Sequence, residues 1–520
     1  MEEPPADSIG FAFVTPDWKG KLKGVTSHLV NLYNAAQDFI VPKYYHDRSY
    51  RSVQMRLYTL TKRQFVLVFI CFFAAFVLTV LIGIAGPSIH VQSEEKILAK
   101  SPDVSGPYEL QSPMVTRFNR SLWLTAIIRV EQKKAASFQD KFNLSVEVKG
   151  QCDDSTLEIL TKTKANHSRT LSCKKGIECN ELLLLYIGTF EYTNYIFTIH
   201  FYDLEDITAK VTELDFYFRS YNPSFSNMEI WFRFVFLVLS FIVTCMFAHS
   251  LRKFTMRDWS IEQKWMSVLL PLLLLYNDPI FPLVFLVDSW IPLVLDTIFQ
   301  ATFLSALLLF WLCAYHGIRH SDHKWVFFYL PKVTIVGLIW LSAILLACWQ
   351  EYEARGDPTF NYKSDSGNYI GLISFFSVVG GLYLLYLIFL IIRAFTELKA
   401  LPYMNLRLKF MTILMLFVVA VSISVTALRF GLSILDENFV TELSSYYENS
   451  VEFLAFYGLL NFYLYTMAFV YSPSKNAHKD SYFKDNPTFS MLNDSEDELI
   501  YGSDSDEART SLTGPYQDSD

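Results

Sequence analysis

Charged residues are scarce in this chain. Asp, Glu, Lys and Arg together make up 18% of the 520 residues, whereas an average soluble domain contains about 25%. No basic stripe accompanies a recognition motif, so we do not expect nucleic-acid binding. The chain also lacks a G-x-S-x-G elbow, a P-loop and an H-E-x-x-H motif. We therefore expect a protein that is not an enzyme and that needs no cofactor.

Hydrophobic residues, by contrast, account for 52% of the chain and aromatic residues for 16%. Soluble domains rarely reach such values, whereas a multi-pass membrane protein reaches them easily. A helix of about 20 apolar residues is long enough to cross the hydrocarbon core. Eight runs meet this condition: Phe65–Ala85, Trp231–Ala248, Trp265–Val287, Leu293–His316, Phe327–Gln350, Tyr369–Ile392, Leu408–Phe430 and Phe453–Tyr471.

The basic residues of the loops predict how these spans are oriented. Lys and Arg cluster before the first span, after the second and fourth, and between the sixth and seventh. Because cytosolic loops are rich in Lys and Arg, both termini are predicted to be cytosolic, residues 1–64 as an N-terminal segment and residues 472–520 as a tail. The first span, residues 65–85, has too long an apolar core for a cleavable signal peptide and is predicted to be a signal anchor.

Residues 88–228 separate the first span from the other seven, which occupy residues 231–471. This orientation places residues 88–228 in the lumen or outside the cell. Their runs SLWLTAIIRVEQ, KFNLSVEVKG, YTNYIFTIHFYDL and ELDFYFRSYN are rich in β-branched and aromatic residues and partly alternate with polar ones. This pattern, with turn residues between the runs, predicts an antiparallel β-sandwich.

The same segment carries signals of an extracytosolic domain. Three N-x-S sequons start at Asn119, Asn143 and Asn166 and predict glycosylation sites. The stretch TLSCKKGIEC is typical of a hairpin and favours a disulfide between Cys173 and Cys179. A different pairing that includes Cys152 stays open.

The third span contains an interruption, LLLLYNDPIFPL. Asn277, Asp278 and Pro279 lie about 18 Å from its cytosolic end. Pro279 has no amide proton, so the helix must kink or unwind there. Broken backbone and an acid at membrane depth are tolerated only inside protein or beside a watery cavity. The alternatives are a kink whose polar groups are satisfied by neighbouring helices, and a cavity that opens toward the lumenal leaflet and holds a lipid, an acyl chain or an amphipathic ligand.

Other polar residues in the same half of the membrane are candidates for this cavity. Asp296 starts the fourth span, Arg429 ends the seventh and Glu452 starts the eighth. Arg429 needs an acidic partner, and Glu452 or Asp296 could supply it. A structural ion pair between helix ends is the alternative to a ligand-binding role.

The C-terminal tail is acidic and has few large apolar residues, so we expect it to be disordered. Asn486, Pro487 and Phe489 form an N-P-x-F pattern of the kind that endocytic adaptors bind. Ser495 and Ser503 precede acids, which predicts phosphorylation by acid-directed kinases. The alternative is a plain linker.

The layout resembles the GOLD-domain seven-transmembrane group, which includes Wntless. The motifs that carry the resemblance lie between residues 229 and 498: EIWFRFVFLVLSFIVTCMFAHSLRKFTMRDWSIEQKWMSVLLPLLLLYNDP, LLLFWLCAYHGIR, LLNFYLYTMAFVYSPSKN and DNPTFSMLNDSEDE. The resemblance implies a GOLD-like β-sandwich over a seven-helix core with the topology of G-protein-coupled receptors. It also implies a trafficking or receptor-like factor of the plasma membrane or the Golgi and endosomal membranes, and a host factor for bacterial cytolethal distending toxin.

The leading hypothesis is thus a non-enzymatic membrane protein that binds a lipidic or protein ligand from the lumenal side, with sorting adaptors at its tail. Two alternatives stay open. The first is an orphan receptor of the G-protein-coupled kind. The second is an intramembrane zinc hydrolase, because His316 and His320 have the i, i+4 spacing that can share a metal and His249 could supply a third ligand.

Overall fold

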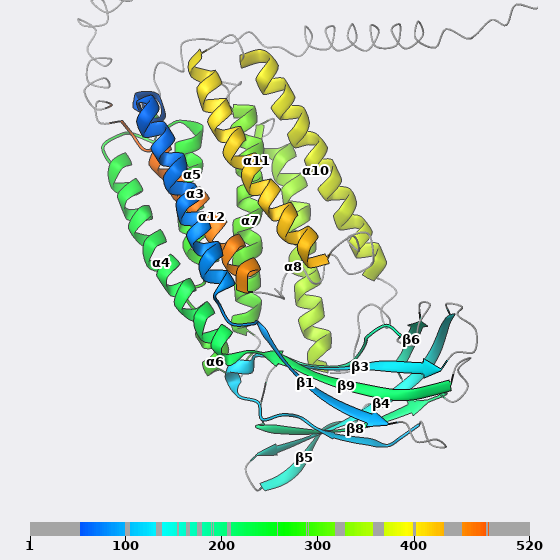
Figure 1. Ribbon diagram of the computed structural model, residues 1–520. Helices are drawn as coiled ribbons and strands as arrows, with labels where there is room; N and C mark the ends of the chain where they lie inside the picture. The colour runs from blue at the N-terminus through cyan, green and yellow to red at the C-terminus, as the bar shows by residue number, and fades with distance from the viewer. Residues whose placement is uncertain are drawn as a thin grey trace, which may run out of the picture. The chain divides into compact units, whose positions relative to one another are not determined.

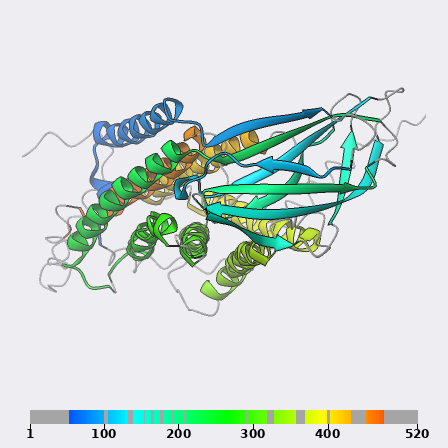
Figure 2. The same cartoon turned by 90° about the horizontal axis from the view of Figure 1, so that it is seen from below.

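The computed structural model consists of a β-sandwich and a bundle of long helices, and the sandwich is inserted in the sequence between the first long helix and the others (Figure 1 and Figure 2). The residues that it describes are 53–98, 105–131, 138–152, 155–162, 167–173, 179–188, 190, 192–204, 210–256, 258–287, 289, 291–317, 328–356, 369–398, 402–430, 450–474 and 477.

The strands of the sandwich belong to two antiparallel sheets, with orders β1-β9-β3-β7 and β2-β8-β4-β5; strand β6 also pairs with β4. The predicted antiparallel sandwich is therefore confirmed. The strand bounds are β1 His90–Leu98, β2 Tyr108–Gln111, β3 Leu122–Glu131, β4 Phe138–Cys152, β5 Ser155–Lys162, β6 His167–Cys173, β7 Leu182–Ile187, β8 Asn194–Tyr202 and β9 Lys210–Tyr221.

Alternation in the sequence determines which side chains fill the sandwich. In β3, every second residue from Leu122 to Val130 is completely buried, because successive side chains of a strand point to opposite faces. Strands β4 and β8 of the other sheet contribute Phe142, Leu144 and Phe197 to the same core. The predicted disulfide between Cys173 and Cys179 is present at the edge of this core. Cys152 ends β4, and its side chain lies outside the described residues.

The helices follow the predicted order of spans. Their bounds are α2 Arg56–Thr59, α3 Lys62–Ile84, α4 Pro223–Leu251, α5 Ile261–Tyr276, α6 Leu283–Leu286, α7 Ile291–Gly317, α8 Leu330–Gly356, α10 Tyr369–Leu398, α11 Pro402–Phe430 and α12 Ser450–Tyr471. A one-turn 3₁₀ helix, η2, covers Arg117–Asn119.

Within the described ranges, six helices are long and apolar enough to cross a membrane: α3, α4, α7, α8, α10 and α12. In α11, the apolar part that meets the criterion for shorter helices is Leu408–Ser422. The remaining predicted span, Trp265–Val287, is not one helix, because α5 stops at Tyr276 and α6 follows only after a turn.

Helix α3 packs closely against the bundle (Figure 1). A Cβ atom added to Gly458 of α12 would come within 2.9 Å of the Thr79 hydroxyl, and one added to Gly83 would come within 2.7 Å of the backbone of Val451. Small residues allow such close approach of membrane helices. Two turns before Thr79 in α3, Phe72 contacts Phe417 of α11, with the ring centroids 5.7 Å apart. The first span is thus an integral part of the helix bundle.

Candidate functional site

The interruption of the third span is a complete break, so the predicted kink or unwinding is confirmed. Helix α5 ends with Asn277 as its C-cap, and Asp278 adopts a left-handed backbone conformation with φ 46°. The Asp278 carboxylate accepts a hydrogen bond from the amide of Ile280 at 3.2 Å. Asn277 and Asp278 are buried, which agrees with the rule that broken backbone at membrane depth lies inside protein.

A buried guanidinium lies beside this break. Arg233 of α4 donates to Glu229, one turn earlier, at 2.9 and 3.1 Å. It also donates to both carboxylate oxygens of Asp296 in α7, at 2.9 and 3.3 Å. Gln300 donates to Asp296 at 2.8 Å. The Arg233 guanidinium therefore bridges two carboxylates, and these charge-assisted bonds connect α4 to α7.

Asp278 brings a third carboxylate to this cluster. Its Oδ2 atom lies 3.9 Å from Arg233 and has no hydrogen-bond partner among the described residues. The guanidinium of Arg233 also lies 3.9 Å from the centre of the Phe281 ring, within the range of a cation–π interaction. The buried cluster thus combines hydrogen-bonded ion pairs, a cation–π contact and one carboxylate oxygen with no donor.

The sandwich contributes the second cation. Arg120, just after η2, donates to Glu229 at 3.1 Å and lies over the Tyr221 ring at 4.9 Å. Burial is the largest single influence on the Arg120 guanidinium and lowers its pKa, but the nearby charges of Glu229, Tyr221 and Asp296 together outweigh burial and raise the pKa. We call the five residues Arg120, Glu229, Arg233, Asp278 and Asp296 the ionic cluster. It holds three carboxylates and two guanidiniums.

The segment Arg117–Arg120 joins the sandwich to the helices, and we call it the junction segment. The Asn119 amide nitrogen donates to the Tyr221 carbonyl at 2.9 Å. Ser226 of α4 donates to the Phe118 carbonyl at 2.7 Å. The Phe118 ring stacks on Phe285 of α6 at 5.5 Å. The junction segment therefore contacts both the start of α4 and the far side of the helix break.

A network of uncharged polar groups lies on the other side of the break. Asn277 and Asn461 of α12 exchange amide hydrogen bonds of 3.0 and 3.2 Å. Asn277 also donates to Ser240 of α4 at 2.8 Å, and the Ser240 hydroxyl is 2.8 Å from that of Tyr465. We call these four residues the amide network. It connects α4, the end of α5 and α12.

A family model described as "Wntless-like, transmembrane domain" matches residues 222–475, and one described as "TMEM181, GOLD domain" matches residues 106–221. The chain is 52% identical over 454 residues to human transmembrane protein 181. The aligned region covers 87% of this chain and 94% of the human protein. The chain belongs to the transmembrane protein 181 family. The resemblance inferred from the motifs is thereby confirmed, and the chain is a multi-pass membrane protein with a GOLD domain.

The structure brings together part of the predicted cavity set. Asn277, Asp278 and Asp296 meet around the break, and Pro279 forms its turn. Asp296, one expected partner of Arg429, pairs with Arg233 at 2.9 Å. Arg429 lies in the last turn of α11, and its side chain lies outside the described residues. Glu452 lies buried in the first turn of α12.

Arg233 and Glu229 were absent from the predicted set. Their signal was present in the sequence, because EIWFRF places an acid and a base four residues apart near the start of the second span. Such a pair shares one helix face. Two charges in an apolar run at membrane depth need further partners, and the break and α7 supply them.

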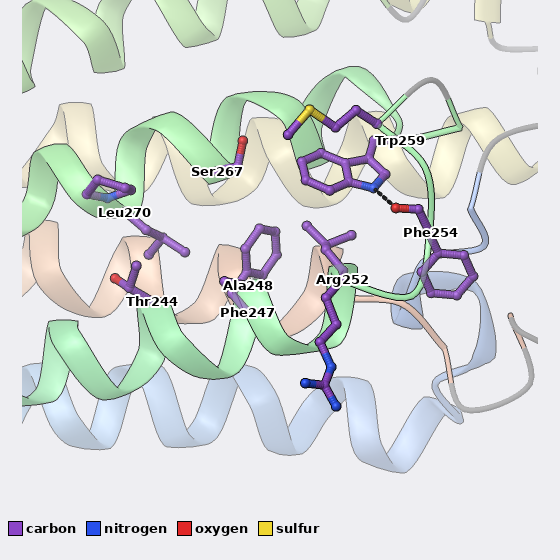
Figure 3. Close-up of a pocket in the computed structure, with 11 residues that line it drawn as sticks. Thr244, Phe247, Ala248, Arg252, Phe254, Trp259, Ser267 and Leu270 are labelled. Carbon is purple, nitrogen blue, oxygen red and sulfur yellow. Dashed lines mark hydrogen bonds between the residues drawn. The ribbon is translucent and has the colours of Figure 1, made fainter.

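A cavity lined by described residues lies at the other end of α4. It has a volume of about 350 Å³ and is lined by residues of α4, of α5 and of the loop between them, including Phe247, Trp259 and Leu270 (Figure 3). Beside Asp278 lies the Arg233 guanidinium at 3.9 Å, which in turn lies 3.9 Å from the centre of the Phe281 ring. The alternative in which neighbouring helices satisfy the polar groups therefore describes most of this site.

The predicted modification sites differ in accessibility. Asn119 is buried, and its amide nitrogen donates to Ser220 and Tyr221, so the structure favours a structural function for this residue. Asn143 lies in β4 and donates to Asp203. Asn166 and the tail residues Asn486, Pro487, Phe489, Ser495 and Ser503 lie outside the described residues.

The three histidines of the hydrolase alternative are only partly described. His249 lies exposed near the end of α4, and His316 lies in the last turn of α7. His320 lies outside the described residues. Among the residues that are described, no three His, Cys, Asp or Glu side chains come together as a metal site requires.

Proposed function

We propose that this protein is a trafficking or receptor-like factor that binds a lipidic or protein ligand on the side of the membrane where the sandwich lies. The observation that carries the proposal is the junction segment. It bonds to α4 through the Phe118 carbonyl and stacks on α6 through the Phe118 ring. A ligand that displaces the sandwich would therefore act directly on the broken third span.

The ionic cluster supports this coupling. Glu229 accepts bonds from Arg120 of the sandwich and from Arg233 of the bundle, at 3.1 and 2.9 Å. A shift of Arg120 would change the charge balance around Glu229 at once, because buried charges interact strongly. Arg233 transmits the change to Asp296 in α7 and to Asp278 at the break. Small displacements at such a packed interface can be converted into a helix rearrangement.

The cytosolic termini and the tail complete the proposal. With both ends of the chain in the cytosol, the N-P-x-F pattern at Asn486, Pro487 and Phe489 would be accessible to endocytic or sorting adaptors. Residence in the plasma membrane or in Golgi and endosomal membranes would follow from such adaptors. Deleting residues 478–520 should then redistribute the protein between these membranes.

The experiment compares cells that lack the protein with cells that express the wild type or the Arg120→Glu variant. Surface proteins are biotinylated and secreted proteins are collected from the medium. Both sets are then quantified by mass spectrometry. The amounts of a defined set of these proteins should fall in cells that lack the protein and should return to normal when the wild type is expressed. The Arg120→Glu variant should reach the same membranes but should not restore the amounts of these proteins, because the new carboxylate repels that of Glu229. Identical surface and secreted proteomes in all cells would refute the trafficking function.

The same cells test the other expectations. The resemblance leads us to propose that cytolethal distending toxin uses this protein, so deleted cells should bind less toxin and resist it. A G-protein signal that depends on the chain while surface delivery stays normal would support the receptor alternative. Stoichiometric zinc in the purified protein would support the hydrolase alternative with His249, His316 and His320.

A further inference from the structure

The cavity between α4 and α5 extends from the helix ends into the hydrocarbon level. Thr244 lies seven residues before the end of α4, and Pro271 lies ten residues after the start of α5. At 1.5 Å per residue these positions are about 10 and 15 Å from the helix ends. The volume of about 350 Å³ is within the range of small-molecule sites. The space therefore lies where the first half of a lipid acyl chain lies.

The lining offers little to a polar ligand. The Thr244 hydroxyl donates to the Ser240 carbonyl at 2.6 Å, and the Ser267 hydroxyl donates to the Lys264 carbonyl at 2.7 Å. The Trp259 indole N–H donates to the Phe254 carbonyl at 3.3 Å, shown as a dashed line in Figure 3. The protons of these lining side chains are thus already engaged with backbone. An apolar occupant would leave all three bonds intact, whereas a polar one would compete for them.

The cavity is open at the surface and closed at its base. Ala248 and Met256 line it and are exposed, whereas Phe247 and Leu270 line it and are buried. Exposed apolar side chains on the same helix, such as Met246 at 68% exposure, belong to the face that meets lipid. A chain can therefore enter sideways from the bilayer.

The rim of the cavity is basic. Arg252 lines it, and its guanidinium extends away from the apolar interior (Figure 3). Lys253 lies between two lining residues and Lys264 lies one turn before the lining Ser267; both are exposed, and none of the described residues that line the space is acidic. The loop charges predict that this end is cytosolic, where the leaflet carries anionic lipids. Basic residues at this level attract such headgroups.

We propose that this cavity binds one acyl chain of an acidic phospholipid, with the headgroup held at Arg252 and Lys264. The loop that covers the cavity is also bonded to the segment that leads into α2, and that segment is bonded to the residue that follows α12. The Val53 amide donates to the Asp258 carbonyl, and Arg56 donates to Ser472 just after α12. The bound lipid thus stabilises the loop that holds the segment leading into α2, and this segment in turn holds the residue after α12.

The test uses the purified full-length protein in nanodiscs that contain phosphatidylserine with a photoreactive group on its acyl chain. After illumination, mass spectrometry should locate the label on peptides that include Phe254, Trp259 and Leu270. The Ala248→Phe variant should lose labelling there several-fold, because the new ring fills the mouth. Met246→Phe adds a ring at an exposed position on the same helix and should retain it.

The headgroup part is tested by competition. Unlabelled phosphatidylserine should displace the probe from the wild type better than phosphatidylcholine or a free fatty acid does. The double variant Arg252→Gln and Lys264→Gln should lose that preference. Equal competition by phosphatidylcholine would overturn the acidic-lipid assignment, and full competition by the fatty acid would assign the site to free acyl chains. Labels spread along the outer helix faces, unchanged in Ala248→Phe, would overturn the site itself.

Discussion

The two ends of helix α4 bury side chains in opposite ways. Near the sandwich, Glu229 and Arg233 are enclosed by charged partners and aromatic rings. Near the other end, Phe247 and Leu251 face a cavity of about 350 Å³. One helix thus contributes to a dense polar interior and to an apolar space.

The difference follows from the cost of leaving each kind of group without contacts. A charge away from water costs several kcal/mol unless it is paired, so ionic groups recruit partners and fill the space between helices. Apolar side chains at membrane depth have no such requirement, because lipid tails are as apolar as they are. Polar residues in a span therefore indicate a closed network, and the open space lies where the lining is apolar.

The variant expected to have the largest effect on stability is Arg233→Leu. The change leaves Glu229, Asp296 and Asp278 buried with less positive charge, which should cost about 3–5 kcal/mol of unfolding free energy. Titration of the purified protein with sodium dodecyl sulfate measures the loss. The control is Arg252→Leu at the other end of the same helix, where the side chain is exposed. A change there should stay within about 0.5 kcal/mol, and equal losses in both variants would contradict the comparison.

The amide network should give a smaller effect. Asn461→Leu removes the partner with which Asn277 exchanges hydrogen bonds and leaves buried polar atoms unsatisfied, at a cost of about 1–3 kcal/mol. The double variant with Asn277→Leu should cost less than the sum of the two single changes, since no unpaired amide then remains. The same titration measures all three variants. Strict additivity would show that the two amides do not act as a pair.

The junction segment should contribute less again. Arg120→Gln removes a charged hydrogen bond to Glu229, and Glu229 keeps its bonds to Arg233, so the loss should be about 1.5 kcal/mol. Arg117→Gln is the matched control, because Arg117 donates to the Leu286 carbonyl from an exposed position. Thermal unfolding in detergent compares the two. A larger effect from Arg117 would place the main coupling elsewhere in the junction segment.

Local patterns in the sequence predicted most of the fold. The alternation in β3 marks the residues that are buried there, and the apolar runs mark the helices. Pro279 predicted the break, because its missing amide proton acts within its own helix. The Cys173–Cys179 disulfide was also predictable, since it closes a short hairpin.

The partners at the break could not be predicted in the same way. Arg233 pairs with Asp296, 63 residues away, and Asn277 pairs with Asn461, 184 residues away. Charge alone allowed Asp296 to pair with Arg429 equally well. Packing decides between such alternatives, because it determines which helix faces meet. The acid–base spacing of Glu229 and Arg233 was the one local signal that pointed to the correct helix.

The smallest expected effect is at the open end. Ala248→Leu adds three carbons at an exposed position that lines the cavity, so the unfolding free energy should change by less than about 0.5 kcal/mol. Ser240 lies two turns earlier on the same helix, is completely buried and bonds to Asn277. Ser240→Leu overfills that position and breaks the amide network, so it should lower the unfolding free energy by about 1–3 kcal/mol. Sodium dodecyl sulfate titration of both variants measures the contrast directly. If Ala248→Leu destabilises as much as Ser240→Leu, the open end is packed as tightly as the closed one, and the lipid site has no room for its ligand.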